Sequence, residues 1–467
     1  MLKITADRLL RGIGDADRSA ALKNTEITGV ETDSRRVGAG SVFVAIPGER
    51  VDGHDYAAAA LQKGAALVVG SRPAAQMPGV PAEKYVQVPD VLDAMIAMGA
   101  NYRDGFDPCV VGVTGSVGKT TTKEFVAAVL SAFGRTLKTE GNQNNEIGMP
   151  NTLFRLEKDT EYAVVEMGMQ GLGEISKLTR AARPRAAVIT CIGVSHLEQL
   201  GSRENILRAK MEICEGLPEG GLLVINGDDS LLTGAAVPSG IRRVAYGVDN
   251  RFCPVTAQDV HTVAGGQRFT IQDRQYGDFE VFIPAVGQHN IYNALAAYTL
   301  ATRLGLDAAA AAAALAGYQT VGHRQHLVRA GGVLVMEDCY NANPDSMRAA
   351  LDTLHQYPVQ GRKMAVLADM RELGAIHAEA HTRLGQQAAA AGVQCLLTFG
   401  EETVLTAQAA REAGVPFVQH FDTREAIVNW LRANTATGDY VLVKGSHSMA
   451  LEEVLEGFYR GKDVQSC

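Results

Sequence analysis

The sequence predicts an α/β protein of three domains, with a mostly parallel sheet in the central one. The chain has 467 residues, which is too long for a single hydrophobic core. Apolar runs rich in β-branched residues alternate with helical segments along most of this length, as in βαβ units. A glycine-rich loop within Val111–Thr121, VGVTGSVGKTT, stands between one such apolar run and a helical run.

We expect the N-terminal domain to span residues 1–107. Three short apolar runs and an alanine-rich helix make up most of it: strands at Ser41–Ile46, Ala65–Val69 and Tyr85–Val88, and a helix at Tyr56–Lys63. A second helix, at about Val91–Arg103, leads into the glycine-rich loop and could belong to either side of the boundary.

We expect the central domain over residues 108–325. Four apolar runs mark its sheet: Val110–Val113, Tyr162–Glu166, Ala187–Ile192 and Leu222–Asn226. The polar stretch Ala257–Glu280, with its scattered glycines, predicts antiparallel hairpins appended to that sheet.

We expect the C-terminal domain over residues 326–467. Its apolar runs alternate with helices as in a Rossmann-like fold: Val333–Glu337, Lys363–Ala368, Cys395–Phe399 and Tyr440–Val443. No glycine fingerprint for NAD accompanies them, so the fold alone does not imply that cofactor.

The composition indicates a cytoplasmic protein. A net charge of −8 argues against a general nucleic-acid surface. The seven cysteines are scattered, with no C-x-x-C pair, which fits reduced thiols. The first residues lack a signal-peptide core, and the alanine-rich run Ala308–Ala314 is too short to span a bilayer. We therefore expect no nucleic-acid partner and no stable membrane insertion.

The glycine-rich loop predicts a phosphate site. A strand, a tight loop and a helix start direct backbone N–H groups and the positive end of a helix dipole at the same point. Lys119 would reach the β- and γ-phosphates of a nucleotide, and the Thr120 hydroxyl would hold Mg²⁺. The spacing is compact, Gly115-x-x-Gly118-Lys119-Thr120, with Val113 where the common form has its first glycine.

Two further residues stand at the ends of apolar strands. Glu166 ends the run Tyr162–Glu166, where a carboxylate would face the ligand crevice and suit Mg²⁺. The alternative is an exposed loop glutamate. His196 closes the segment CIGVSH after the next strand, and no second histidine stands at zinc spacing. A lone histidine is more often structural than a ligand, but this placement favours a function.

Lys210 has apolar neighbours three and four residues away in the helical segment Arg203–Glu215. Burial would lower its pKa and favour a neutral amine, which CO₂ converts to a carbamate that could reach a metal ion. The alternative is a snorkelling lysine whose stem packs while its ammonium reaches water.

The motifs together resemble those of the Mur ligases, the ATP-dependent, amide-bond-forming family of peptidoglycan synthesis. They are TDSRR (32–36), VFVAIPGERVDGHDY (42–56), TGSVGKTTTKE (114–124), GNQNNEIGMPNTL (141–153), EMGMQGLGEI (166–175), GQHNIYNALAA (287–297), DCYNANPDSM (338–347), LADMRELG (367–374) and KGSHSM (444–449). The Asn144-Asn145 pair and the YNANP segment point to the branch that adds D-alanyl-D-alanine. The Asp-Asn-Pro-Arg motif of the branch that adds diaminopimelate is absent, but a ligase adding a single diaminopimelate or lysine is the alternative.

The resemblance implies a role for each motif. ATP would contact Gly115, Ser116, Val117, Gly118, Lys119, Thr120, Thr121, Asn290, Asn293, Arg324 and Asp338. Two Mg²⁺ ions would be held by Thr120, Glu166, His196 and a carbamylated Lys210, and the catalytic groups would be Lys119, His196, Lys210 and Arg324. UDP-N-acetylmuramoyl-tripeptide and D-alanyl-D-alanine would contact Ser34, Arg35, Gly48, Asp52, His54, Asn144, Asn145, Tyr340, Asn341, Asn343, Lys444 and Ser446. The enzyme is expected to be a monomer.

Two small departures from the family pattern stand out: Ala368 replaces a usual glycine, and His447 stands where arginine is common. Two other classes of nucleotide protein fit less well. A GTPase switch would need an Asn-Lys-x-Asp motif, which is absent. A P-loop motor or transport ATPase would normally end a neighbouring strand in aspartate, a place taken here by Glu166.

Overall fold

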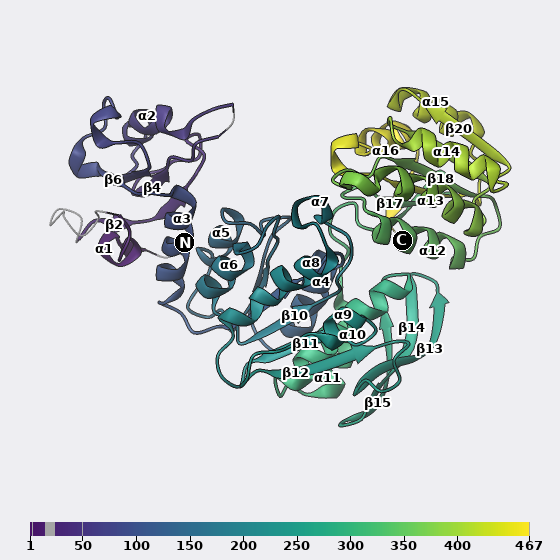
Figure 1. The fold of residues 1–467 in the computed structure, drawn as a ribbon, viewed down its shortest axis with the longest axis horizontal. Coiled ribbons are helices and arrows are strands. Elements are labelled where there is room, and N and C mark those ends of the chain that lie inside the picture. Colours follow the sequence, from purple (N-terminus) through teal and green to yellow (C-terminus); the bar gives the residue numbers. More distant parts are fainter. Residues whose placement is uncertain (2, 15–23, 49, 467) are drawn as a thin grey trace.

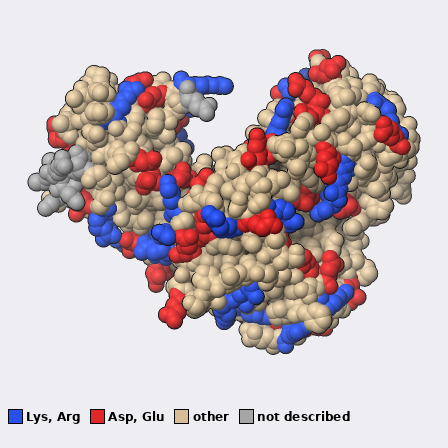
Figure 2. Space-filling model, in the orientation of Figure 1, with Lys and Arg blue, Asp and Glu red and all other residues tan. Residues whose placement is uncertain are grey.

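A computed structural model describes residues 1, 3–14, 24–48 and 50–466. Three lobes follow one another along the chain, and the N- and C-terminal lobes stand on the same side of the central one (Figure 1). A deep notch separates these two lobes above the central domain (Figure 2). The predicted α/β class is confirmed.

The N-terminal lobe is built on a parallel sheet in the order β3-β4-β5-β6. Its strands are β3 (Gly29–Glu31), β4 (Ser41–Val44), β5 (Leu67–Gly70) and β6 (Tyr85–Gln87), with helices α1 (Ala6–Leu9), η2 (Gly53–Tyr56), α2 (Ala57–Gln62), η3 (Ala74–Gln76) and η4 (Ala82–Lys84). A small antiparallel pair, β1 (Ile4–Thr5) and β2 (Glu26–Ile27), lies beside it.

Helix α3 (Val91–Arg103) joins the first lobe to the second. The Asp90 carboxylate caps it by accepting bonds from the N–H groups of Leu92 and Asp93. Gly99 lets α3 approach the helix α5 (Gly148–Leu153) closely, since a Cβ there would lie 3.0 Å from Pro150 Cβ. One hydrophobic cluster extends through both lobes, so α3 is shared between them.

The central sheet has the strand order β15-β14-β13-β12-β11-β10-β7-β9-β8. Its strands are β7 (Cys109–Thr114), β8 (Thr136–Lys138), β9 (Tyr162–Glu166), β10 (Ala186–Ile189), β11 (Leu222–Asn226), β12 (Arg242–Gly247), β13 (Val255–Val263), β14 (Gly266–Asp273) and β15 (Gly277–Ile283). Strands β7 to β12 pair in parallel, and β13, β14 and β15 form the expected antiparallel addition.

Helices pack around the central sheet, and the two longest of them bury apolar residues against it. The helices are α4 (Lys119–Ser131), α5 (Gly148–Leu153), α6 (Glu174–Ala182), α7 (Leu197–Leu200), α8 (Arg203–Met211), η5 (Glu212–Gly216), α9 (Ser230–Gly234), α10 (Gln288–Arg303), α11 (Ala308–Ala314) and η6 (Leu315–Gly317). The expected helix to Glu215 tightens to 3₁₀ form after Met211.

The C-terminal sheet has the order β20-β19-β18-β21-β17-β16-β22. Its strands are β16 (His326–Ala330), β17 (Val333–Asp338), β18 (Lys363–Ala368), β19 (Cys395–Phe399), β20 (Phe417–Phe421), β21 (Tyr440–Lys444) and β22 (Val464–Ser466). The helices are α12 (Pro344–Gln356), η7 (Gly374–Ile376), α13 (His377–Ala390), α14 (Thr403–Glu412), α15 (Arg424–Asn434), η8 (His447–Met449) and α16 (Glu452–Tyr459). Strands β17 to β21 run in parallel, as in a Rossmann-like fold.

Within the described ranges, no helix is both long and apolar enough to cross a membrane. The six cysteines of those ranges are free thiols.

Candidate active site

A cavity of about 1070 Å³ opens at the carboxyl ends of the central strands. Its walls come from the glycine-rich loop, the ends of β9 and β10, the first turn of α10, and the C-terminal domain around β17, α12 and β21. Ligands of open α/β sheets bind at this edge, which makes the cavity the candidate active site.

The glycine-rich loop has the backbone that a phosphate cradle needs. Gly115 and Gly118 have φ of 150° and 81°, and a Cβ on Gly115 would overlap the Thr190 hydroxyl. Helix α4 starts at Lys119, whose Nζ donates to the Gly115 carbonyl at 2.8 Å. Ser116, Val117, Gly118, Lys119, Thr120 and Thr121 line the cavity.

The surroundings of Lys119 destabilise its protonated form. Burial lowers the pKa of Lys119, the Arg324 guanidinium lowers it further, and the Glu166 carboxylate opposes both. An anion placed between Lys119 and Arg324 would relieve this repulsion.

Glu166 ends β9 inside the cavity wall and is 1% exposed. Its Oε1 accepts a bond from Asn144 Nδ2 at 2.7 Å, whereas its buried Oε2 has no hydrogen-bond partner. Lys123 Nζ lies 4.0 Å from that Oε2 and 2.9 Å from Glu124 Oε1. The Glu166 carboxylate thus has one oriented oxygen and one available to a further ligand.

His196 follows β10 in a left-handed conformation, with φ of 63°. Its buried Nδ1 has no hydrogen-bond partner and lies 3.6 Å from Glu372 Oε2 of the C-terminal domain. Burial lowers the pKa of His196 to about 4, and the Lys119 and Lys210 charges add to this. The imidazole is therefore neutral near pH 7.

Lys210 is 1% exposed in α8, so its ammonium does not snorkel to water. Its side-chain ammonium makes no hydrogen bond or ion pair with the described residues, and Lys210 does not line the cavity. Burial and the Lys119 charge hold the pKa of Lys210 well below its ordinary value. Both conditions favour a neutral amine.

Asn290 and Asn293 belong to a buried polar chain that links α10 to α4. Thr122 Oγ1 donates to Asn293 Oδ1 at 2.8 Å, and Asn293 Nδ2 donates to Asn290 Oδ1 at 3.1 Å. Asn290 Nδ2 in turn donates to the Val286 carbonyl. Both asparagines also line the cavity.

The C-terminal domain contributes a buried ion pair. Asp338 and Lys444 are partners at the carboxyl ends of β17 and β21, and Lys444 Nζ lies 2.8 Å from Asp338 Oδ2. Lys444 Nζ also donates to the Asn341 carbonyl at 2.9 Å. The ring of Tyr340 lies beneath the Arg324 guanidinium, and all five residues line the cavity.

Asn343 connects the C-terminal domain to the central one. Its Oδ1 caps α12 by accepting from the Ser346 N–H, and its Nδ2 donates to Ser195 Oγ at 2.9 Å. Ser446 lies deeper, where its Oγ accepts from the Arg371 N–H, and it is not among the cavity residues.

The neighbouring residues Asn144 and Asn145 have different hydrogen-bond partners. Asn144 orients Glu166, whereas Asn145 Oδ1 caps the start of α5 by accepting from the Gly148 N–H at 2.9 Å. Both line the cavity.

The predicted residues of the N-terminal lobe do not reach the cavity. These are Ser34, Arg35, Gly48, Asp52 and His54. His54 is buried, with Nδ1 against Asp52 Oδ1 at 2.6 Å and Nε2 accepting the Ser71 N–H. His54 therefore stabilises the loop formed by residues 48–54, in which Glu49 lies outside the described residues. Arg35 is exposed beside Asp33 and holds the pKa of that carboxyl at about 2.

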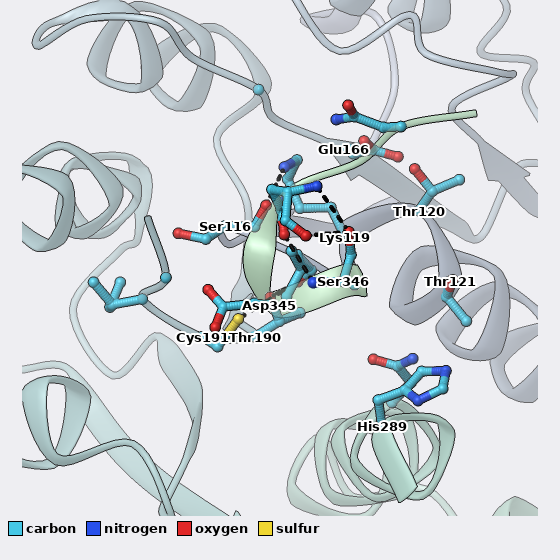
Figure 3. A pocket seen from close by; sticks show the side chains of 18 of the residues that line it. Ser116, Lys119, Thr120, Thr121, Glu166, Thr190, Cys191, His289, Asp345 and Ser346 are labelled. Carbon is cyan, nitrogen blue, oxygen red and sulfur yellow. Dashed lines mark hydrogen bonds between the residues drawn. The ribbon is translucent and has the colours of Figure 1, made fainter. Parts of the chain in front are cut away.

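Sequence reasoning missed several groups of the site. His289 and Asp345 line the cavity (Figure 3). The buried Lys123 Nζ lies 4.0 Å from Glu166 Oε2. His289 and Asp345 stand inside motifs already noted, beside assigned asparagines, and this proximity was the available signal. Lys123 also stands inside a noted motif, TGSVGKTTTKE, but its burial beside Glu166 depends on the packing of α4 against the sheet.

Within the part of the chain that the structure describes, no three His, Cys, Asp or Glu residues form a metal-binding group. A cation here would need oxygen ligands from a bound anion besides Glu166, which is how Mg²⁺ is usually held beside phosphates.

Three family models match the chain in succession. They are described as the Mur ligase family catalytic domain, over residues 26–103, the Mur ligase middle domain, over 113–301, and the Mur ligase glutamate ligase domain, over 323–447.

Similar proteins extend over the full length. The chain is 36% identical to the UDP-N-acetylmuramoyl-tripeptide–D-alanyl-D-alanine ligase of Bacillus subtilis, over 98% of both chains. It is 37% identical to the Escherichia coli ligase of the same name, over 93% and 94%. MurF from Acinetobacter baumannii superposes with a TM-score of 0.87 at 30% identity, over 98% and 99%. MurF from Thermotoga maritima, in complex with ADP, does so with 0.83 at 30% identity, over 92% and 97%.

Proposed function

The chain belongs to the Mur ligase family, and we propose that it joins D-alanyl-D-alanine to UDP-N-acetylmuramoyl-tripeptide in an ATP-dependent, ADP-forming reaction. The observation that carries the proposal is the single cavity in which the phosphate loop and Glu166 meet Arg324 and the Asp338–Lys444 pair. Full-length similarity to ligases of that name supports the choice of substrates.

We assign the steps as follows. The tripeptide carboxylate attacks the γ-phosphorus of ATP, ADP leaves, and an acyl phosphate forms. The amine of D-alanyl-D-alanine then attacks the acyl carbon, and phosphate leaves as the amide forms. Two anions meet in the first step, so its rate depends on cationic groups at the phosphates, for which Lys119 and Arg324 are the candidates.

Mg²⁺ fits the residues present. The orphaned Glu166 Oε2 is a buried hard oxygen, and the Thr120 hydroxyl lines the same cavity. When bound, the ion would neutralise phosphate charge. We place a second ion with His196, whose Nδ1 is unpartnered, and with a carbamate on Lys210, whose buried neutral amine suits reaction with CO₂.

We assign the remaining sites by domain. Residues 1–107 would bind the UDP-sugar through Ser34, Arg35, Gly48, Asp52 and His54. Residues 108–325 would bind ATP, with Asn290 and Asn293 on the adenine side. Residues 326–467 would bind the dipeptide near Tyr340, Asn341, Asn343, Lys444 and Ser446, with Asp338 at the ribose.

All of these groups come from one chain, so we propose that the enzyme is a monomer. We also propose that it acts in the cytoplasm. No nucleic acid or membrane enters the scheme.

The test is phosphate release from ATP by the purified enzyme. Release should require both UDP-N-acetylmuramoyl-tripeptide and D-alanyl-D-alanine, with pentapeptide product seen by mass spectrometry. Turnover with a single diaminopimelate or lysine and a UDP-dipeptide would instead identify the alternative ligase. Release that needs neither substrate would refute both.

A further inference from the structure

The segment Cys191–His196 lies between the phosphate loop and the C-terminal domain. On one side, the Ser116 N–H donates to the Cys191 carbonyl at 2.9 Å and Thr190 Oγ1 donates to the Val117 carbonyl at 2.5 Å. On the other side, the first turn of α12 reaches the segment, and a Cβ on Gly193 would overlap the Asp345 carboxylate. Figure 3 shows Asp345 beside Cys191.

One hydroxyl of this segment contacts both sides. Ser195 Oγ accepts from Asn343 Nδ2 at 2.9 Å and donates to the Ser116 carbonyl at 3.4 Å. The amide orientation follows from the helix cap, because Asn343 Oδ1 is already the acceptor of the Ser346 N–H. Ser195 has one proton, which is therefore free to point at Ser116.

The Ser116 carbonyl has a second, competing donor. Lys119 Nζ also lies 3.4 Å from it, while donating to Gly115 at 2.8 Å. When Lys119 turns toward a phosphate, Ser195 becomes the remaining side-chain donor to that carbonyl. A hydroxyl that donates more strongly also accepts more strongly, which strengthens its bond from Asn343.

We propose that Ser195 is a positioning residue that couples nucleotide in the phosphate loop to docking of the C-terminal domain. The inference rests on the proposed function for the identity of the nucleotide. The coupling is one neutral hydrogen-bond pair, so its loss should change the docking equilibrium of the nucleotide-bound enzyme about three- to tenfold.

The experiment is small-angle scattering of the full-length protein with Mg²⁺ and adenosine 5′-(β,γ-imido)triphosphate. Wild type should compact as nucleotide is added. Ser195→Ala and Asn343→Asp should each compact less; the second keeps a cap acceptor for Ser346 while removing the donor. The double variant should be no worse than the singles, and Ser195→Thr should restore the response.

Ser176→Ala is the matched control, because it removes a serine hydroxyl bonded to Glu215, away from the cavity. It should compact like wild type. Compaction of Ser195→Ala equal to wild type, additive losses in the double variant, or no compaction of wild type would each overturn the coupling. A wild type that compacts but forms no peptide product would refute the proposed function and leave the coupling standing.

Discussion

The Arg324 guanidinium carbon lies 3.9 Å from the centre of the Tyr340 ring, although the two residues belong to different segments of the domain junction. The Tyr340 ring also stacks on His447, with centroids 5.7 Å apart. His447, which stands where arginine is common in the family, thus packs against the Tyr340 ring. This stack holds Arg324 beside the cavity, close enough to Lys119 to lower its pKa.

Removing the Tyr340 ring should therefore impair the use of ATP. A cation over an aromatic face contributes about 0.5–2 kcal/mol, so Tyr340→Leu should lower kcat/KM for ATP about three- to thirtyfold. Tyr340→Phe keeps the face and should retain most activity. Steady-state kinetics at saturating second and third substrates measure this, and equal activity of the Leu variant and wild type would contradict it.

Asn144 should tune the metal affinity of the site through Glu166. Asn144→Ala removes the donor that orients Glu166 Oε1. We expect the Mg²⁺ concentration for half-maximal rate to rise about tenfold. Losing a residue that hydrogen-bonds a metal ligand typically weakens metal binding by at least this factor, about tenfold. Mn²⁺ binding, followed by electron paramagnetic resonance with ADP present, should weaken in parallel.

Asn145→Ala is the neighbouring control for this effect. Asn145 caps α5, so its loss should lower the melting temperature while leaving the Mg²⁺ requirement unchanged. A similar Mg²⁺ shift in both variants would show that Asn144 acts only through the fold.

His289 should make stability depend on pH. Burial lowers the pKa of His289 to about 4, opposed by the Asp338 charge and a bond to Gln325 and aided by Lys444. Between about pH 6.5 and pH 4 the unfolded chain binds a proton that the folded chain does not, so the free energy of unfolding falls as pH falls. His289→Gln should reduce this loss by about 1–2 kcal/mol between pH 7.5 and pH 5.

Urea unfolding at pH 7.5 and pH 5 measures the difference. His196 titrates in the same pH window and is present in both wild type and His289→Gln. The informative quantity is therefore the difference between the two proteins in how steeply the free energy of unfolding changes with pH. Identical slopes would show that His289 is solvated in the folded state.

Four buried strands could be predicted from the sequence to the residue, whereas buried β10 ends at Ile189 and not at the predicted Ile192, and the interior strand β12 was missed. Strands β9, β11, β18 and β19 have the predicted bounds, because strands covered on both faces need continuous apolar runs. Short or edge strands such as β8 and β22 were missed, since backbone pairing rather than an apolar pattern specifies them.

Some groups of the site could likewise be predicted from the sequence, and others could not. Groups at strand ends, such as Glu166, could be placed because the fold class determines which edge of the sheet they share. The contact between Ser195 and Asn343 could not, because it joins residues 148 positions apart and depends on how two domains meet.

Lys210 offers the sharpest test of the proposed metal chemistry. If the buried amine is carbamylated, the group that matters is an anion. Lys210→Ala should then lose most activity with the fold intact, and Lys210→Arg should be equally poor, because guanidinium stays positive and cannot be carbamylated. Acetate or another short carboxylate should partly restore Lys210→Ala by filling the space with an anion, and should do little for Lys210→Arg. Activity with added acetate and bicarbonate, together with ¹³C NMR of enzyme in labelled bicarbonate, measures these outcomes. An active Lys210→Arg enzyme would refute the carbamate and leave Thr120, Glu166 and His196 as the proposed protein ligands.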